Sequence, residues 1–217
     1  MSHARVPFGV LISGGGTNLQ ALLDAASAPE FPGTPAVVIS NRRDAYGLVR
    51  AQKAGVPAVW LPHRGKPREA YDAELVRCLQ EHGVQWVVMA GFMRLVTPVL
   101  LSAFPYRVLN IHPSLLPAFP GIHAQKQAHD YGVRLAGATV HLVSLEMDAG
   151  PIVLQGATPV VAGDDPDALQ QRILRIEHTI YPRALALALR GQLRLVGRKI
   201  QLPPGEEGCV WEPAPAV

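Results

Sequence analysis

Short, continuously apolar runs alternate with helix-like segments over the first ninety residues of the chain. The apolar runs predict strands at residues 6–13, 36–40, 58–61 and 84–89. The segments between them predict helices from residue 17 onward, over 46–54 and over 67–82. A run such as Ala36-Val37-Val38-Ile39 lacks polar alternation, which is typical of parallel strands covered on both faces. Repeated strand–helix–strand units of this kind predict an α/β fold: a doubly wound, mostly parallel open sheet with helices on both faces.

The second half of the chain departs from this regular alternation. A strand is expected at 108–111, then a proline-rich loop at 112–121 and a short helix at 123–130. Strands at 138–145 and 152–155, joined by a polar turn, precede a long helix at 166–189 and a short strand at 194–196. Residues from Pro203 are rich in proline and glycine, which is typical of a poorly ordered terminus. We therefore expect one domain over residues 1–202 and a poorly ordered tail over 203–217.

Composition and charge narrow the class of protein. With 217 residues, 48% of them apolar and 17% charged, the chain is too hydrophobic for a disordered protein and long enough to bury a core. The net charge of +3 is small and scattered, so it predicts no nucleic-acid partner. No apolar run reaches the length of a membrane span, and the first residues lack a signal-peptide core. Cys78 and Cys209 make no disulfide framework, so a cytoplasmic protein is expected.

A glycine-rich segment, Ser13-Gly14-Gly15-Gly16-Thr17-Asn18, lies between the first predicted strand and the first predicted helix. Thr17 is the expected N-cap of that helix. Glycines let backbone N–H groups approach an anion, and a helix N-terminus adds favourable partial charge. The segment has Leu19 where a dinucleotide fingerprint has its third glycine, and no lysine follows as in a P-loop. It therefore favours a phosphate monoester over a dinucleotide or ATP, with a tight turn of purely structural role as the alternative.

Three polar residues in the second half have side chains suited to acyl chemistry. Alternation along the predicted strand points Asn110 and His112 to the same side, and an amide beside an imidazole can hold an oxyanion or deliver a proton. Asp148 lies in a turn beside glycine, where an aspartate is ordinary. Taken singly, each of the three is also explained by a structural role, and spacing alone does not bring them together. The eight histidines lack metal-ligand spacing, so no metal is expected.

Several segments taken together resemble a known family. They are residues 12–20, 90–94, 110–121, 137–150 and 177–182. In order along the chain, from about residue 6 to residue 202, they resemble the folate-dependent phosphoribosylglycinamide formyltransferases. The stretch Asn110-Ile111-His112-Pro113-Ser114-Leu115-Leu116-Pro117 is shared by the wider group of enzymes that use 10-formyltetrahydrofolate, so it indicates chemistry rather than substrate. The glycine segment, residues 120–123 and the segment at Glu177 indicate the glycinamide branch.

The resemblance implies a reaction in which the amine of glycinamide ribonucleotide attacks the formyl carbon of 10-formyltetrahydrofolate. Asn110 would contact this formyl donor and donate a hydrogen bond to the oxyanion that forms. His112, protonated beside Asp148, would donate a second, charge-assisted bond. Asp148 would help to move a proton from the attacking amine to the leaving nitrogen.

The resemblance also implies binding residues. The substrate phosphate would lie on Gly15, Gly16, Thr17 and Asn18, and Glu177 would meet the ribose or the amine. Met93, Arg94, Leu95 and Val96 would line the folate pocket, with residues 142–148 as a loop that faces the pterin. Arg68 and Arg94 would pair with the benzoylglutamate carboxylates, and His123 would have a supporting role. Leu174 stands where some relatives carry a polar or basic residue, which puts a phosphate contact from that helix in question.

Three alternatives remain open beside this interpretation. A formyltetrahydrofolate deformylase would share Asn110, His112 and Asp148, but such enzymes are expected to carry an extra N-terminal domain, for which no room precedes Val6. A methionyl-tRNA formyltransferase is expected to have a basic C-terminal domain, whereas this chain ends in an acidic, proline-rich tail. A non-catalytic module that binds a phosphate ligand would use only the glycine segment. Small-molecule substrates are therefore the expected partners, with no nucleic acid and no membrane, and a homodimer is compatible with the sequence.

Overall fold

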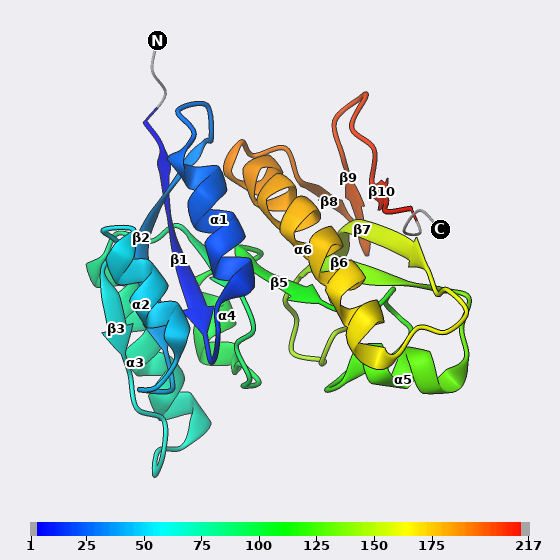
Figure 1. The fold of residues 1–217 in the computed structure, drawn as a ribbon. Helices are drawn as coiled ribbons and strands as arrows, with labels where there is room; N and C mark the ends of the chain where they lie inside the picture. The colour runs from blue at the N-terminus through cyan, green and yellow to red at the C-terminus, as the bar shows by residue number, and fades with distance from the viewer. Residues whose placement is uncertain (1–3, 214–217) are drawn as a thin grey trace.

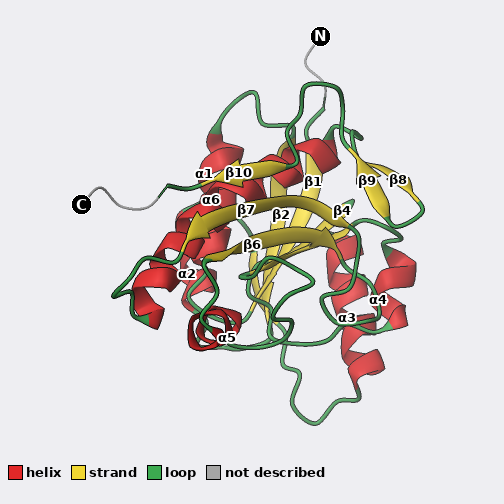
Figure 2. Cartoon of the chain, turned by 90° about the vertical axis from the view of Figure 1, so that its right-hand side faces the viewer, coloured by secondary structure: helices red, strands yellow, loops and turns green. Residues whose placement is uncertain are grey.

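Eight strands form one sheet with helices on both faces, so the molecule has three layers (Figures 1 and 2). The structure, a computed structural model, describes residues 4–213. The strands of this sheet are β1 (Val6–Ile12), β2 (Gly33–Ser40), β3 (Ala58–Trp60), β4 (Trp86–Met89), β5 (Val108–His112), β6 (Leu135–Leu142), β7 (Ile152–Pro159) and β10 (Cys209–Trp211). They lie in the order β10-β7-β6-β5-β4-β1-β2-β3.

The helices are α1 (Thr17–Ser27), α2 (Tyr46–Lys53), α3 (Arg68–Glu81), α4 (Pro98–Ala103), α5 (Ala124–Tyr131) and α6 (Pro166–Leu189). A separate hairpin consists of β8 (Arg194–Val196) and β9 (Lys199–Gln201). None of the helices in the described part of the chain combines the length and apolarity needed to cross a membrane.

Five neighbouring strands of the sheet, β3, β2, β1, β4 and β5, run parallel, as their continuous apolar runs predict. Neighbouring residues of a strand point to opposite faces, and both faces of this half are buried. Val10 and Ile12 pack into the core beneath α1 and α6, whereas Leu11 packs into the core beneath α3 and α4. In Figure 2, α1, α2 and α6 lie on one side of the sheet and α3 and α4 on the other. The predicted α/β class, with a doubly wound and mostly parallel sheet, is confirmed.

Beyond β5 the sheet changes direction, and some predictions fail there. β6 is antiparallel to both β5 and β7, and the two strands cover 135–142 and 152–159 instead of 138–145 and 152–155. The prediction of a poorly ordered tail is wrong for residues 209–211, because β10 pairs with β7 in parallel and extends the sheet. Residues 214–217 of that tail lie outside the described residues. α4 and β9 were not predicted at all.

The carboxyl ends of the parallel strands β1, β4 and β5 meet at one edge of the sheet. The register places Leu11 beside Met89, and Met89 beside Asn110. The Tyr181 hydroxyl of α6 donates to the carbonyl oxygens of Met89, at 2.9 Å, and of Leu109, at 3.2 Å. α6 is therefore fixed across β4 and β5. Ligands of doubly wound sheets bind beyond this edge.

Candidate active site

The glycine segment forms the turn between β1 and α1, and Gly14 and Gly15 are exposed there. Gly16 occupies the N-cap position with φ of 73°, and no side chain caps the helix. The prediction of Thr17 as N-cap is therefore wrong: Thr17 is the first helical residue. A Cβ on Gly16 would lie 2.8 Å from the Cα of Gly47, so only glycine fits there. A Cβ on Gly14 or Gly15 would meet nothing within 4 Å, and no hydrogen bond in the described part of the chain uses the N–H groups of Gly15 and Gly16. These two groups can therefore serve as donors to an anion.

Asn18 and Glu177 connect this turn to α6. The Asn18 Nδ2 donates to Glu177 Oε2 at 2.5 Å, and the Asn18 Oδ1 is buried without a partner among the described residues. Glu177 lies one helical turn before Tyr181, so the bonds of Tyr181 to β4 and β5 hold the carboxyl group at the sheet edge. Burial raises the pKa of Glu177 to about 7, although the hydrogen bond from Asn18 acts in the opposite direction. The unpartnered amide oxygen and this carboxyl group can both bind hydroxyl or amine groups of a ligand.

The Glu177 carboxyl group is expected to make stability depend on pH. Its pKa in the folded state is about 7, against an ordinary value of 4.5, so the folded protein binds the extra proton and loses stability as pH rises between these values. The free energy of unfolding of the wild type, minus that of Glu177→Gln, should fall by about 3 kcal/mol from pH 4 to pH 8. Urea unfolding of both proteins across this range measures it. A difference that stays constant with pH would contradict the assignment.

Asn110 is held by a histidine on the neighbouring strand. Asn110 of β5 lies opposite His141 of β6, and the Asn110 Nδ2 is 3.2 Å from His141 Nε2. The other ring nitrogen, Nδ1, is 3.0 Å from the carbonyl oxygen of Leu142, which can only accept, so the proton lies on Nδ1. Burial lowers the pKa of His141, in keeping with a neutral ring. His141 Nε2 therefore accepts from the Asn110 amide and fixes the orientation of that group. The second N–H of Asn110 has no partner among the described residues.

His112 and Asp148 meet beside Asn110. His112 Nδ1 is 3.5 Å from Asp148 Oδ2, and His141 Nε2 is 3.9 Å from Asp148 Oδ1. The His112 Nε2 is 2.9 Å from the carbonyl oxygen of Phe119, which requires a proton on Nε2. The other ring nitrogen, Nδ1, then faces the carboxylate of Asp148. The site thus links the Asn110 amide, through His141, to the Asp148 carboxylate and the His112 imidazole.

The loop between β6 and β7 folds back to bring Asp148 to this point. Asp148 has φ of 52°, and its Oδ2 accepts from the backbone N–H of Gly121 at 2.8 Å. A Cβ on Gly150 would lie 1.7 Å from the carbonyl oxygen of Leu142, so glycine allows the chain to pass over β6. The loop borders a pocket of about 280 Å³ that is lined by Leu116, Pro117, Pro120, residues 146–150, Ile152 and Arg198. The Leu116–Pro117 bond is cis.

Large apolar side chains stand exposed on two loops near the site. Met93 and Leu95 follow β4 and are 72% and 52% exposed, while Leu145 and Met147 of the Asp148 loop are 65% and 51% exposed. Exposed apolar side chains of this size can form a binding surface for an apolar ligand. Ser13 fixes the first loop to β1, because its hydroxyl donates to Asn41 Oδ1 at 2.7 Å and accepts from the Met93 N–H at 2.9 Å. Val96 of the same loop packs at the edge of the core beneath α3 and α4.

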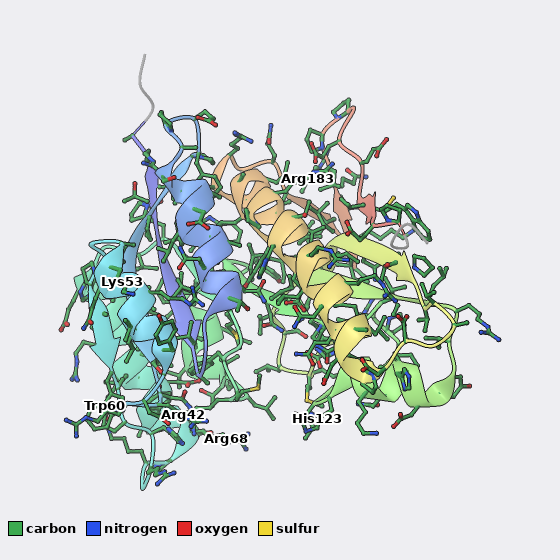
Figure 3. The ribbon with its side chains drawn as sticks, viewed as in Figure 1. Arg42, Lys53, Trp60, Arg68, His123 and Arg183 are labelled. Carbon is green, nitrogen blue, oxygen red and sulfur yellow. The ribbon has the colours of Figure 1, made fainter. Side chains whose placement is uncertain are left out.

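The predicted basic residues occupy different surroundings. The Arg94 guanidinium lies 4.7 Å from the centre of the Tyr71 ring, and its Nε is buried without a partner among the described residues. Arg68 is the first residue of α3 and is exposed, with no contact to Asn110, His112 or Asp148. Figure 3 places Arg68 and His123 at the lower edge of the molecule, at different positions along it. His123 is the exposed N-cap of α5, with φ of 58°.

The structure therefore brings some predicted residues together and leaves others apart. Asn110, His112 and Asp148 form one cluster, and Asn18 joins Glu177. Three residues of the site were not predicted to have a role in it: Ser13 as an anchor, His141 and Tyr181. His141 is the residue opposite Asn110 once β6 is paired antiparallel to β5, and no spacing along the chain gives that register. Among the described residues, no group of three His, Cys, Asp or Glu side chains is arranged to hold a metal ion.

Comparison with known proteins assigns the class. Residues 7–185 match the family model described as formyl transferase. The chain thus belongs to the formyl transferase family, whose members use a folate-derived formyl donor. It is 43% identical over 187 residues to phosphoribosylglycinamide formyltransferase of Escherichia coli, covering 86% of this chain and 88% of that protein. A solved structure of glycinamide ribonucleotide transformylase 1 from Symbiobacterium toebii is 53% identical, covers 91% of this chain and 94% of its own, and superposes with a TM-score of 0.89.

Two further relatives show that similarity to this family does not by itself define the activity. The trifunctional purine biosynthetic protein adenosine-3 of Drosophila pseudoobscura pseudoobscura is 47% identical, over 90% of this chain, but this chain spans only 15% of its length. A formyltetrahydrofolate deformylase from Pseudomonas syringae has the same fold, with a TM-score of 0.86, at 29% identity, and this chain covers 67% of it. The fold is thus shared by proteins named as transformylases and by one named as a deformylase.

Proposed function

We propose that this protein transfers the formyl group of 10-formyltetrahydrofolate to the amine of glycinamide ribonucleotide, the activity named in its relatives of similar length. The observation that carries the proposal is the cluster of Asn110, His112 and Asp148 at the same sheet edge as the glycine turn, whose Gly15 and Gly16 N–H groups have no partner among the described residues. A formyl carbon beside the cluster and a phosphate on the turn would belong to two substrates bound side by side.

The residues divide the chemistry among them. The free N–H of Asn110 donates to the formyl oxygen as negative charge develops on it. His112, protonated beside Asp148, exchanges its bond to the Phe119 carbonyl for a second, charge-assisted bond to this oxygen. Asp148 stabilises the positive ring and takes the proton that the attacking amine loses, which then passes to the leaving nitrogen of the folate. The bond from amine nitrogen to formyl carbon forms, and the bond from formyl carbon to folate nitrogen breaks.

The binding roles follow from the surroundings of each group. The backbone N–H groups of Gly15 and Gly16 and the start of α1 at Thr17 and Asn18 support a phosphate site. Glu177 supports binding of the ribose hydroxyls or the amine. The exposed side chains of Met93 and Leu95, together with Val96 of the same loop and the Asp148 loop, support a slot for the pterin. Arg94 and Arg68 are proposed to attract the folate carboxylates, and His123 to have a supporting role at the rim.

The experiment follows the release of tetrahydrofolate from 10-formyltetrahydrofolate under three conditions: with glycinamide ribonucleotide, with formylatable tRNA, and with neither. Release that requires the ribonucleotide, together with formylated product, is the expected result. Release with neither acceptor would replace the proposal by a deformylase, and release with tRNA by a tRNA formyltransferase. Binding of the ribonucleotide without any release would indicate a non-catalytic module.

A further inference from the structure

Helix α2 supports the glycine turn from the side of its carbonyl groups. The N–H of Gly47 donates to the carbonyl oxygen of Gly14 at 3.0 Å. The Nε of Arg50, one turn further along α2, donates to the carbonyl oxygen of Gly15 at 2.9 Å. Two consecutive carbonyl groups of the turn are therefore held toward α2.

The direction of these carbonyl groups fixes the direction of the N–H groups. In a planar trans peptide, the C=O of one residue and the N–H of the next point in opposite directions. When the Gly14 and Gly15 carbonyls point toward α2, the N–H groups of Gly15 and Gly16 point away from it. No hydrogen bond within the described part of the chain uses these two N–H groups. A glycine backbone would otherwise rotate freely, so an external contact is needed to keep this orientation.

Arg50 is itself held in place, which makes it suited to this role. Its guanidinium lies 5.1 Å from the centre of the Tyr46 ring, and its Nη1 donates to Gln20 Oε1 at 3.0 Å. Gln20 is in turn bonded to Asp24 at 2.8 Å on the same face of α1. The long side chain of Arg50 thus has little rotamer freedom left to lose when a ligand binds.

We infer that Arg50 is a positioning residue for phosphate binding: its guanidinium holds the Gly15–Gly16 peptide with its N–H toward the ligand. The inference rests on the proposed function for the identity of the ligand as a ribonucleotide phosphate. Arg50 contacts the carbonyl side of the turn, opposite to the N–H groups, and we propose no contact between Arg50 and the ligand. It acts through the orientation of a peptide group, which lowers the cost of arranging donors around an anion.

The test compares Arg50→Gln with Lys53→Gln. Lys53 lies three residues later on the same helix, lines the same surface hollow and is exposed. Figure 3 shows it at the end of α2 that lies away from the lower edge. Both variants remove one positive charge, but only the first removes the bond to Gly15. Arg50→Gln should raise the KM for the ribonucleotide about tenfold. Its kcat and its KM for 10-formyltetrahydrofolate, and all constants of Lys53→Gln, should stay within about twofold of wild type.

Two results would overturn the inference: an unchanged ribonucleotide KM in Arg50→Gln, or equal increases in both variants, which would indicate charge alone. If Arg50→Gln does not fold, Arg50→Lys provides the comparison, because it keeps the charge but cannot make the same set of contacts. Calorimetric binding of ribose 5-phosphate to each variant does not depend on turnover. It therefore separates this inference from the proposed function. If the wild type transfers no formyl group but Arg50→Gln still binds ribose 5-phosphate more weakly than wild type, the role of Arg50 stands and the proposed function is rejected.

Discussion

The Asp148→Asn variant is expected to lose at least about 100-fold in kcat while keeping the wild-type fold. The Asp148 carboxylate lies 3.5 Å from His112 Nδ1 and 3.9 Å from His141 Nε2, where it can hold a positive charge on the first ring and take up a proton. An amide of the same shape can do neither. A loss of this size corresponds to about 2.7 kcal/mol of the barrier.

The fold should survive because asparagine suits the backbone at this position. Asp148 has φ of 52°, a conformation that asparagine adopts more readily than most residues. The amide oxygen of the variant can still accept from the Gly121 N–H. Steady-state turnover measures the loss, and thermal unfolding checks that the protein remains folded.

Glu146→Gln is the matched control for this variant. Glu146 lies two residues earlier in the same loop, borders the same pocket and is exposed, so its substitution removes an equal charge without touching either histidine. We expect Glu146→Gln to keep kcat within about threefold of wild type. Near-normal turnover in Asp148→Asn, or an equal loss in Glu146→Gln, would exclude the role given to Asp148.

The parallel half of the fold follows from local pattern, and the antiparallel half does not. Strands such as β2 are apolar on both faces and flanked by amphipathic helices, so their order and direction follow from chain connectivity. β10 has three residues, two of them exposed, and only its pairing with β7 makes it a strand. Its stabilising contacts lie more than fifty residues away in the chain, beyond the reach of a local pattern.

The same distinction applies to the site. Alternation along β5 is enough to place Asn110 and His112 at the end of one strand, although the opposing His141 depends on the register of β6. Asp148 reaches the cluster through a loop whose path is set by Gly150 and by a bond to Gly121. Thr17 was expected to cap α1, but Gly16 occupies the N-cap position. A Cβ on Gly16 would collide with the Cα of Gly47 in α2, so this position depends on a contact with another helix.

The Asn110→Leu variant is expected to lower kcat by about 100-fold to 1,000-fold, with smaller changes in the KM values of both substrates. Leucine branches at Cγ as asparagine does but carries no donor, so the developing negative charge on the formyl oxygen loses a preorganised partner. Asn110 is only half-buried, which limits the effect on folding. Stopped-flow measurement of a single turnover isolates the chemical step.

A graded comparison with His141→Leu tests how the Asn110 amide is oriented. His141 Nε2 accepts one of the two N–H groups of Asn110, at 3.2 Å, so its removal leaves the donor in place but free to rotate. We therefore expect His141→Leu to lose about tenfold in kcat, clearly less than Asn110→Leu, because only orientation is lost. The double variant should be no slower than Asn110→Leu alone, since the two residues act through one hydrogen bond donor. Independent, multiplicative losses would show that His141 affects the reaction by another route than Asn110.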